Sequence, residues 1–269
     1  MAPPKFKNLT LEVVDGAIAI ITLRREFSAN SLHPDLLIEW IAAMRWIIVV
    51  PEISVVVQTS AGKFFCTGMD FDNWPPPKDE LAENMDSFIA NFKVLNELLI
   101  TCDKVLIAAV NGPCAGYGVT CLALYDLVYA VPSSYYFCPF LKWGFSAEGC
   151  STLTFPQIMG HQKASALLLA GERMSAEELS AAGLITKVTG EKSLMKDVME
   201  VATRISQCPP GAPAATKNLM LTNNREKLLS INALECVVLR TRLHDPACQA
   251  AAAAFTERKK KRAAGASRL

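Results

Sequence analysis

The chain has 269 residues, enough for one large domain or for a domain with a smaller appendage. Its residues are 51% hydrophobic and 20% charged, which excludes a disordered protein, and its formal net charge of +1 provides no overall field that would favour nucleic acid. The longest apolar stretch, Ile38–Val50, is interrupted by Glu39 and Arg45 and is too short for a membrane span, and the N-terminal residues lack the apolar segment of a signal peptide.

Predicted strands and helices alternate through the first two thirds of the chain. Two apolar segments, Leu9–Val14 and Ala17–Leu23, flank Asp15-Gly16, a dipeptide typical of a tight hairpin turn. Apolar residues at helical spacing follow over Pro34–Ile48. Further strands are predicted at Ile53–Thr59, Phe64–Phe65, Val105–Val110, Leu127–Val131 and Tyr135–Cys138, and further helices at Leu81–Ile100 and Gly116–Leu124.

From Ser151 onward the pattern is almost wholly helical. Ser175 with Glu178 forms a capping box, and Asp245-Pro246 is a cap followed by proline in the first turn. Alternating strands and helices followed by helices alone predict an α/β body with a helical C-terminal layer. We expect a core of residues 1–195 and a C-terminal helical region of residues 196–269.

Two loops share a design that suits the binding of an oxyanion. In Lys63–Asp70 (KFFCTGMD) and Ala108–Gly118 (AAVNGPCAGYG), an apolar segment runs into a glycine-containing loop that opens a helix or turn. Glycine permits close backbone approach, and a helix start leaves N–H groups unpaired. Two converging loops of this kind could direct two N–H donors at one oxygen. Taken alone, each loop is more simply a turn.

The order of these motifs resembles the crotonase (enoyl-CoA hydratase/isomerase) superfamily. The motifs FFxxGxD, a long helix, AAVNGxxxGxG and DxVYA follow one another as in the core of that family. The resemblance implies a spiral of ββα units and a C-terminal helical oligomerisation region, giving a homotrimer or hexamer. It also implies that the thioester carbonyl of an acyl-CoA substrate binds the backbone N–H groups of Met69 and Tyr117. The glycines that support these loops are Gly68, Gly112 and Gly116.

The acid–base positions distinguish members of this family. Hydratases use two glutamates, and the matching positions here hold Thr120 and Phe140, which cannot carry a proton near neutral pH. A carboxylate occurs instead at Glu148, in a segment similar to the peroxisomal Δ3,Δ2-enoyl-CoA isomerases, in which the matching glutamate is the single catalytic base. The resemblance implies that Glu148 moves a proton from C2 to C4 of a 3-enoyl thioester. Taken in isolation, Glu148 would more simply cap a helix at Ser151 or face solvent.

Other reactive side chains fit a catalytic or metal site less well. The three histidines, His33, His161 and His244, are scattered and have no nucleophilic partner in an elbow motif. The nine cysteines contain no CxxC pair, so we expect small buried hydrophobes and neither disulfides nor a metal site. The aspartates Asp70, Asp72 and Asp126 are typical of turns or caps. No cofactor is implied, because coenzyme A is part of the substrate.

The C-terminal residues allow several interpretations. The basic run Arg258–Arg262 is typical of a solvated helix end, could mimic a nuclear signal, and in the family could meet the phosphates of coenzyme A. The last three residues, Ser267, Arg268 and Leu269, are a conservative variant of the Ser-Lys-Leu peroxisomal address. We therefore expect localisation in the peroxisomal matrix, with the peroxisomal import receptor as a partner.

Together these features predict an isomerase that converts 3-enoyl-CoA to trans-2-enoyl-CoA in fatty-acid β-oxidation. Two alternatives remain open. The chain could be another crotonase-fold acyl-CoA enzyme, namely a dienoyl-CoA isomerase, a hydratase or a thioester hydrolase, or it could be a catalytically silent CoA-binding oligomer. The carboxylate at position 148 favours an enzyme, because a silent relative has no reason to place one at the family's base position.

Overall fold

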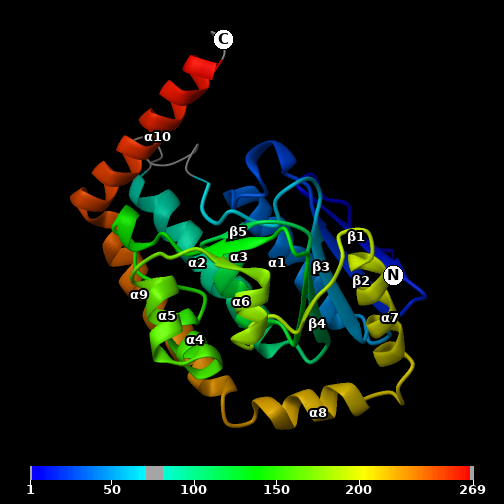
Figure 1. Ribbon diagram of the computed structural model, residues 1–269. Helices are drawn as coiled ribbons and strands as arrows, with labels where there is room; N and C mark the ends of the chain where they lie inside the picture. Colours follow the sequence, from blue (N-terminus) through cyan, green and yellow to red (C-terminus); the bar gives the residue numbers. More distant parts are fainter. Residues whose placement is uncertain (1, 71–80, 267–269) are drawn as a thin grey trace.

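A six-stranded sheet organises the N-terminal body of the computed structural model, which describes residues 2–70 and 81–266 (Figure 1). Its first two strands are antiparallel and the others are parallel. In spatial order the strands are β1 (Leu9–Val14), β2 (Ile18–Leu23), β3 (Val55–Ser60), β4 (Val105–Val110), β6 (Leu127–Ala130) and β9 (Lys187–Val188).

The predicted hairpin is confirmed at the start of this sheet. Asp15 and Gly16 both adopt left-handed backbone conformations, with φ of 51° and 69°. The N–H of Ala17 donates to the carbonyl of Val14 at 3.2 Å and closes the turn. The Asp-Gly pair thus supplies the positive φ angles that a tight connection between antiparallel strands requires.

A second, three-stranded sheet makes the fold a spiral. It contains β5 (Cys114–Ala115), β7 (Tyr135–Phe137) and β8 (Met174–Ser175). The chain passes from β4 in the large sheet to β5 in the small one, and again from β6 to β7, as expected of ββα units.

Three details differ from the sequence prediction. The segment Phe64–Phe65 is not a strand; only Cys66 forms a bridge, to Cys114. The strands β8 and β9 lie in the part predicted to be almost wholly helical. Two-residue strands are too short to show a periodic pattern, and they form only because β7 and β6 offer backbone partners.

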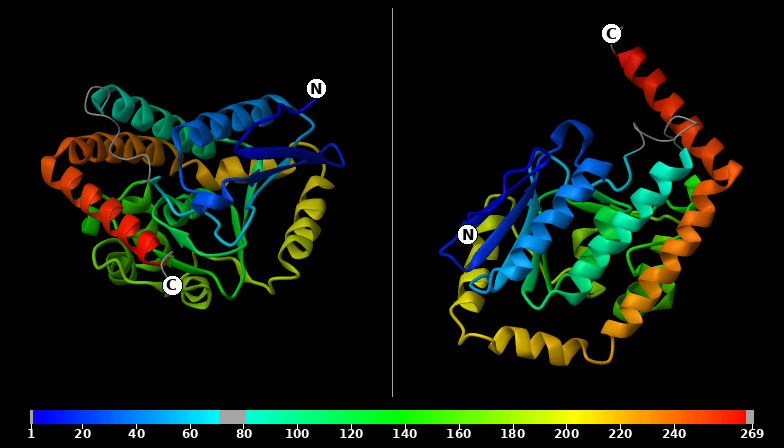
Figure 2. Two further views of the ribbon diagram at one scale, coloured as in Figure 1. Left: turned by 90° about the horizontal axis from the view of Figure 1, so that it is seen from above. Right: turned by 180° about the vertical axis from the view of Figure 1, so that it is seen from behind.

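Helices surround both sheets and make up the C-terminal part of the chain (Figure 2). The capping box of Ser175 and Glu178 is confirmed, and the Asp245 side chain accepts from the N–H of Ala247 as a helix cap. The α-helices are α1 (Pro34–Val49), α2 (Leu81–Thr101), α3 (Tyr117–Thr120), α4 (Ser151–Met159), α5 (His161–Leu168), α6 (Ala176–Ala181), α7 (Leu194–Ser206), α8 (Ala212–Leu221), α9 (Arg225–His244) and α10 (Pro246–Ala266). Single 3-10 turns are η1 (Glu26–Ser28), η3 (Cys121–Leu124) and η4 (Leu141–Trp143).

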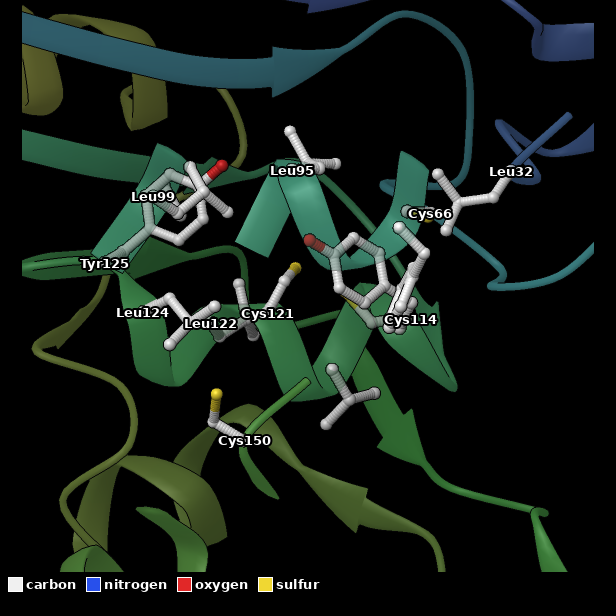
Figure 3. Packing of buried hydrophobic residues seen from close by; sticks show 14 of the residues in the cluster. Leu32, Cys66, Leu95, Leu99, Cys114, Cys121, Leu122, Leu124, Tyr125 and Cys150 are labelled. Atoms are coloured by element: carbon white, nitrogen blue, oxygen red, sulfur yellow. The ribbon is translucent and has the colours of Figure 1, made fainter. Parts of the chain in front are cut away.

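Both faces of the large sheet are buried, because alternate side chains of each strand point to opposite sides. On one face, Val57 and Ile107 pack with Val198 of α7. On the other, Val56 and Leu106 belong to the main core with the residues of α1 and α2. Figure 3 shows part of this core, in which cysteine and leucine side chains pack together. Eight of the nine cysteines are buried and all nine are free thiols, as the sequence predicts.

The C-terminal helices begin beside the body and end beyond it. Helix α9 lies along α2, and α10 extends away from the sheets (Figures 1 and 2). Among the described helices, none is long and apolar enough to cross a bilayer. The predicted division near residue 195 stays a prediction. Helix α7, which begins at Leu194, packs on the sheet of the N-terminal body.

Candidate active site

One pocket gathers most of the site residues that the sequence singles out. Gly68 and Met69 come from the first glycine loop, Gly116 and Tyr117 from the second, and Glu148 from the segment before α4. The remaining wall is largely apolar, which suits a hydrocarbon chain. It includes Leu32, Phe88, Phe92, Phe140, Phe145 and Leu239.

The two glycine loops lie side by side at the pocket. Cys66 and Cys114 form a parallel bridge, and the N–H of Ala115 donates to the carbonyl of Cys66 at 3.0 Å. Tyr117 is the first residue of α3, so its N–H has no acceptor within the helix. Among the described residues, no hydrogen bond engages the backbone N–H of Met69 or Tyr117. The arrangement leaves both donors available to one ligand oxygen.

The three supporting glycines are needed for different reasons. A Cβ at Gly112 would lie 2.0 Å from the carbonyl oxygen of Lys63, so the two loops can pack backbone against backbone only without a side chain there. A Cβ at Gly116 would meet nothing closer than 3.7 Å, but φ of 52° with ψ of −122° is a conformation that other residues avoid. At Gly68, φ is 73° and space is restricted as well.

A buried ion pair anchors the loop that carries Met69. The Arg25 guanidinium donates to the Asp70 carboxylate at 2.6 Å, and both side chains are less than a tenth exposed. The N–H of Leu32 adds a hydrogen bond to the carbonyl of Gly68 at 2.7 Å. Asp70, expected as a turn residue, therefore ties the first loop to the chain before α1.

The hydroxyl of the Tyr117 side chain is hydrogen-bonded within the core. Its hydroxyl donates to Oδ1 of Asn96 at 2.8 Å, and Nδ2 of Asn96 donates to Oδ1 of Asn232 at 2.9 Å. This buried polar chain joins α3 to α2 and α9. Burial holds the pKa of the phenol well above its usual range, so the hydroxyl stays protonated.

Glu148 lines this apolar pocket, and one of its carboxylate oxygens has no partner among the described residues. The side chain is 5% exposed; Oε1 accepts from the Thr120 hydroxyl at 3.0 Å, and Oε2 has no hydrogen-bond partner among the described residues. Burial, and after it the Glu235 carboxylate, raises the pKa of Glu148 to about 8, although the Thr120 hydrogen bond acts in the opposite direction. A carboxyl group with such a pKa can both take up and release a proton near neutral pH.

The simpler interpretations of Glu148 are wrong. The group is not at the surface, and its carboxylate does not cap α4. Its backbone carbonyl accepts from the Ser151 hydroxyl at 2.6 Å, while the carboxylate that receives the N–H groups at the start of α4 is that of Glu235.

The other titratable residues named from the sequence lie elsewhere. Asp126 forms an ion pair with the buried Lys217 and accepts from the N–H of Leu106. Asp72 and the tripeptide 267–269 fall outside the described residues. In the described ranges, no group of three His, Cys, Asp or Glu side chains is placed to hold a metal ion. Each histidine lies at a helix end: His33 is the N-cap of α1, His161 begins α5 and His244 ends α9.

Two residues that contact Glu148 or its segment could not be recognised as parts of the site from the sequence. From the sequence, Thr120 shows only that a hydratase glutamate is missing, whereas in the structure its hydroxyl donates to Glu148. Glu235 lies 87 residues further along the chain, in a stretch that the sequence marks only as helical. No local motif marks either role. The catalytic roles of Glu148, Met69 and Tyr117 themselves stay predictions.

Comparisons with known proteins agree with this geometry. A family model described as Enoyl-CoA hydratase/isomerase matches residues 14–264. Enoyl-CoA delta isomerase 2 from Homo sapiens is 34% identical over 263 residues, covering 95% of this chain and 65% of that protein. Chromodomain Y-like protein from Homo sapiens is 29% identical over 244 residues, covering 88% of this chain and 40% of that protein. This chain thus spans less than two thirds of the length of both relatives.

A solved structure gives the same result for the fold. The crystal structure of an enoyl-CoA hydratase/isomerase from Pseudoalteromonas atlantica T6c superposes with a TM-score of 0.84 at 26% sequence identity. The superposition covers 94% of this chain and 98% of that chain. The predicted crotonase-like spiral is therefore confirmed.

Proposed function

The chain belongs to the enoyl-CoA hydratase/isomerase family, the crotonase superfamily, and from that premise we propose that it is a Δ3,Δ2-enoyl-CoA isomerase. Its substrate is a 3-enoyl-CoA thioester and its product is trans-2-enoyl-CoA. The observation that carries the proposal is the carboxylate of Glu148, the one carboxylate among the described residues that line the apolar pocket. Its Oε2 has no hydrogen-bond partner, and the two backbone donors belong to residues of the same pocket.

The reaction needs one base and one oxyanion site. Glu148 Oε2 takes a proton from C2, the C2–H electron pair delocalises into the thioester carbonyl, and a dienolate forms. The N–H groups of Met69 and Tyr117 stabilise the negative oxygen. The protonated Glu148 then delivers its proton to C4, and the double bond settles between C2 and C3. A pKa raised to about 8 makes the carboxylate a stronger base than an ordinary glutamate and still allows the proton to return.

The same pocket argues against hydration. Adding water needs a second group to hold and deprotonate it, and the two positions where the family's hydratases carry glutamate hold Thr120 and Phe140. Thr120 is fully buried and donates to Glu148, and Phe140 contributes an apolar ring to the pocket wall. Neither side chain can activate a water molecule.

We expect purified protein to consume 3-enoyl-CoA and to hydrate 2-enoyl-CoA slowly or not at all. The measurement compares turnover of 3-enoyl-CoA, 2-enoyl-CoA and 3,5-dienoyl-CoA under one set of conditions. Hydration as fast as isomerisation would contradict the proposal, and consumption of the dienoyl substrate alone would favour a dienoyl-CoA isomerase. Binding of CoA without turnover would favour a silent oligomer, which is a useful test because one relative is a chromodomain protein.

We also propose that the enzyme works in fatty-acid β-oxidation as a homotrimer or hexamer in the peroxisomal matrix. Exposed apolar side chains on α8 and α9 support self-association, notably Leu219 at 77% exposure and Val237 at 64%. The C-terminal tripeptide Ser267, Arg268 and Leu269 supports recognition by the peroxisomal import receptor.

Deletion of Ser267, Arg268 and Leu269 is expected to leave the protein in the cytosol, because the import receptor reads a C-terminal tripeptide. A fluorescent reporter carrying the last twelve residues should enter peroxisomes. The same reporter with the tripeptide removed and the basic run kept serves as the matched control. A nuclear signal from either reporter would support the nuclear interpretation of the basic run instead.

A further inference from the structure

Glu235 of α9 holds the segment that carries Glu148. Its side chain is 5% exposed and accepts three hydrogen bonds. The N–H of Cys150 donates at 2.7 Å to Oε2, and the N–H and hydroxyl of Thr152 donate to Oε1 at 3.0 Å and 2.5 Å. All three donors lie within four residues of Glu148. A residue from the C-terminal helical layer thus fixes the backbone next to the proposed base.

The backbone that follows Glu148 has an unfavourable conformation that these hydrogen bonds stabilise. Gly149 and Cys150 are consecutive left-handed residues, with φ of 65° and 62°, and cysteine adopts such a φ only at a cost. A Cβ at Gly149 would lie 2.7 Å from Oγ1 of Thr120, so the segment is also pressed against the partner of Glu148. Hydrogen bonds from Cys150 and Thr152 to a fixed acceptor stabilise this tight turn.

Glu235 also occupies the N-terminus of α4. Cys150 is the N-cap of that nine-residue helix, and Thr152 is its second residue. The start of a helix carries unpaired N–H groups and a partial positive charge that would favour a nearby ionised carboxylate. Glu235 takes that place, and among the described residues the Thr120 hydroxyl is the one donor to the Glu148 carboxylate.

We propose that Glu235 is a positioning residue of the isomerase, which captures the N-terminus of α4 and thereby keeps the Glu148 carboxylate at the pocket with its Oε2 free of backbone donors. The proposal rests on the isomerase function proposed above. Glu235 does not line the pocket, so it acts through the Glu148 segment and not on the substrate.

The charge of Glu235 has a second consequence, for the protonation of Glu148. Its negative carboxylate adds to the effect of burial and raises the pKa of Glu148. The other titratable groups that face Glu148 are neutral, because burial raises their pKa values: the phenol of Tyr117 and the thiols of Cys66, Cys121, Cys138, Cys150 and Cys236. Burial also raises the pKa of Glu235 itself, but the hydrogen bonds from Thr152 and Cys150 oppose that rise and favour its charged form. Among the described residues, Glu235 is therefore the group whose charge acts on the base.

Two variants separate positioning from charge. Glu235→Gln keeps the shape and one acceptor oxygen but removes the charge, whereas Glu235→Ala removes the anchor. We expect Glu235→Ala to lower kcat by about 10²-fold with little change in KM, because a small displacement of a catalytic group has an effect of this size. Glu235→Gln should move the low-pH limb of the kcat profile to lower pH, since Glu148 loses the neighbouring charge.

Leu243→Ala is the matched control. Leu243 is fully buried in the same helix, and it takes no part in the hydrogen bonds between Glu235 and the Glu148 segment. It should lower the melting temperature by loss of packing and leave kcat and the pH profile unchanged. Equal effects of Leu243→Ala and Glu235→Ala on kcat would show that Glu235 only stabilises α9, and the proposal would be wrong.

A second readout does not depend on turnover. The pKa of the Glu148 carboxyl can be followed by carbon NMR or by infrared difference spectroscopy, with Glu148→Gln used to identify its signal. This pKa should be lower in Glu235→Gln than in the wild type. An unchanged pKa of Glu148 in Glu235→Gln, together with a wild-type kcat in Glu235→Ala, would overturn the proposal. A wild type that does not isomerise 3-enoyl-CoA would contradict the proposed function alone, because the carboxyl titration would still test the effect of Glu235 on Glu148.

Discussion

Replacing Glu148 with glutamine is expected to lower the rate of isomerisation by about 10²–10⁴-fold, the usual cost of losing a positioned general base. Glutamine keeps the shape of the side chain and can accept the Thr120 hydrogen bond, but its amide cannot take a proton from C2. The steady-state rate with 3-enoyl-CoA is the measurement. Binding of CoA should remain nearly unchanged, because the pocket keeps its shape.

The same variant should be at least as stable as the wild type. The pKa of Glu148 is raised from 4.5 to about 8, so the folded chain binds a proton that the unfolded chain has released between these two pH values. The free energy of unfolding of the wild type therefore falls as pH rises through that window, and Glu148→Gln should lack this part of the fall. Thermal unfolding of both proteins at pH 5 and pH 8 measures the difference.

Glu178→Gln makes the same chemical change in an exposed capping box away from the pocket and should keep wild-type turnover. Wild-type turnover in a folded Glu148→Gln protein would show that another group moves the proton. A stability gain of Glu148→Gln over the wild type that is larger at pH 5 than at pH 8 would contradict the raised pKa of this buried carboxylate.

Replacing Gly68 with alanine should lower kcat by about 10²–10³-fold, the effect of losing one oxyanion donor. A Cβ at this position would lie 3.0 Å from the carbonyl oxygen of Ala115 and 3.3 Å from the backbone nitrogen of Tyr117. It would therefore crowd the second donor, and φ of 73° also disfavours alanine there. Turnover of 3-enoyl-CoA, with folding checked by circular dichroism, is the measurement.

Tyr117→Phe is the control for this loop, because it alters a donor residue without altering its N–H. Loss of the hydroxyl leaves Oδ1 of Asn96 buried without its partner, so the free energy of unfolding should fall by about 1–3 kcal/mol. Turnover of the folded protein should change little. A folded but inactive Tyr117→Phe enzyme would show that the phenol takes part in the chemistry, and an active Gly68→Ala enzyme would show that the loop donors do not.

Much of the fold follows from local sequence patterns, and the differences have physical causes. The Asp15-Gly16 hairpin and the capping box at Ser175 could be predicted because each depends on neighbouring residues. The strands β8 and β9 could not, because each has two residues and exists only through a partner far along the chain.

The candidate site divides in the same way. The glycine loops and Glu148 are found through their resemblance to family motifs, each of which is continuous in sequence. The contacts that prepare Glu148 are discontinuous: Thr120 lies 28 residues away and Glu235 lies 87 residues away. Only the folded chain brings them together, so the raised pKa of Glu148 could not be predicted from the residues around it.

The buried polar chain from Tyr117 through Asn96 to Asn232 also has a consequence for the order of folding. Asn96 and Asn232 are 136 residues apart, and Nδ2 of Asn232 reaches the carbonyl of Lys93 across a similar separation. Contacts between such distant segments form late, because a long loop must close first. The helix that presents the N–H of Tyr117 therefore reaches its final environment only when α9 docks on α2. A refolding chain should regain secondary structure well before it regains a competent oxyanion site.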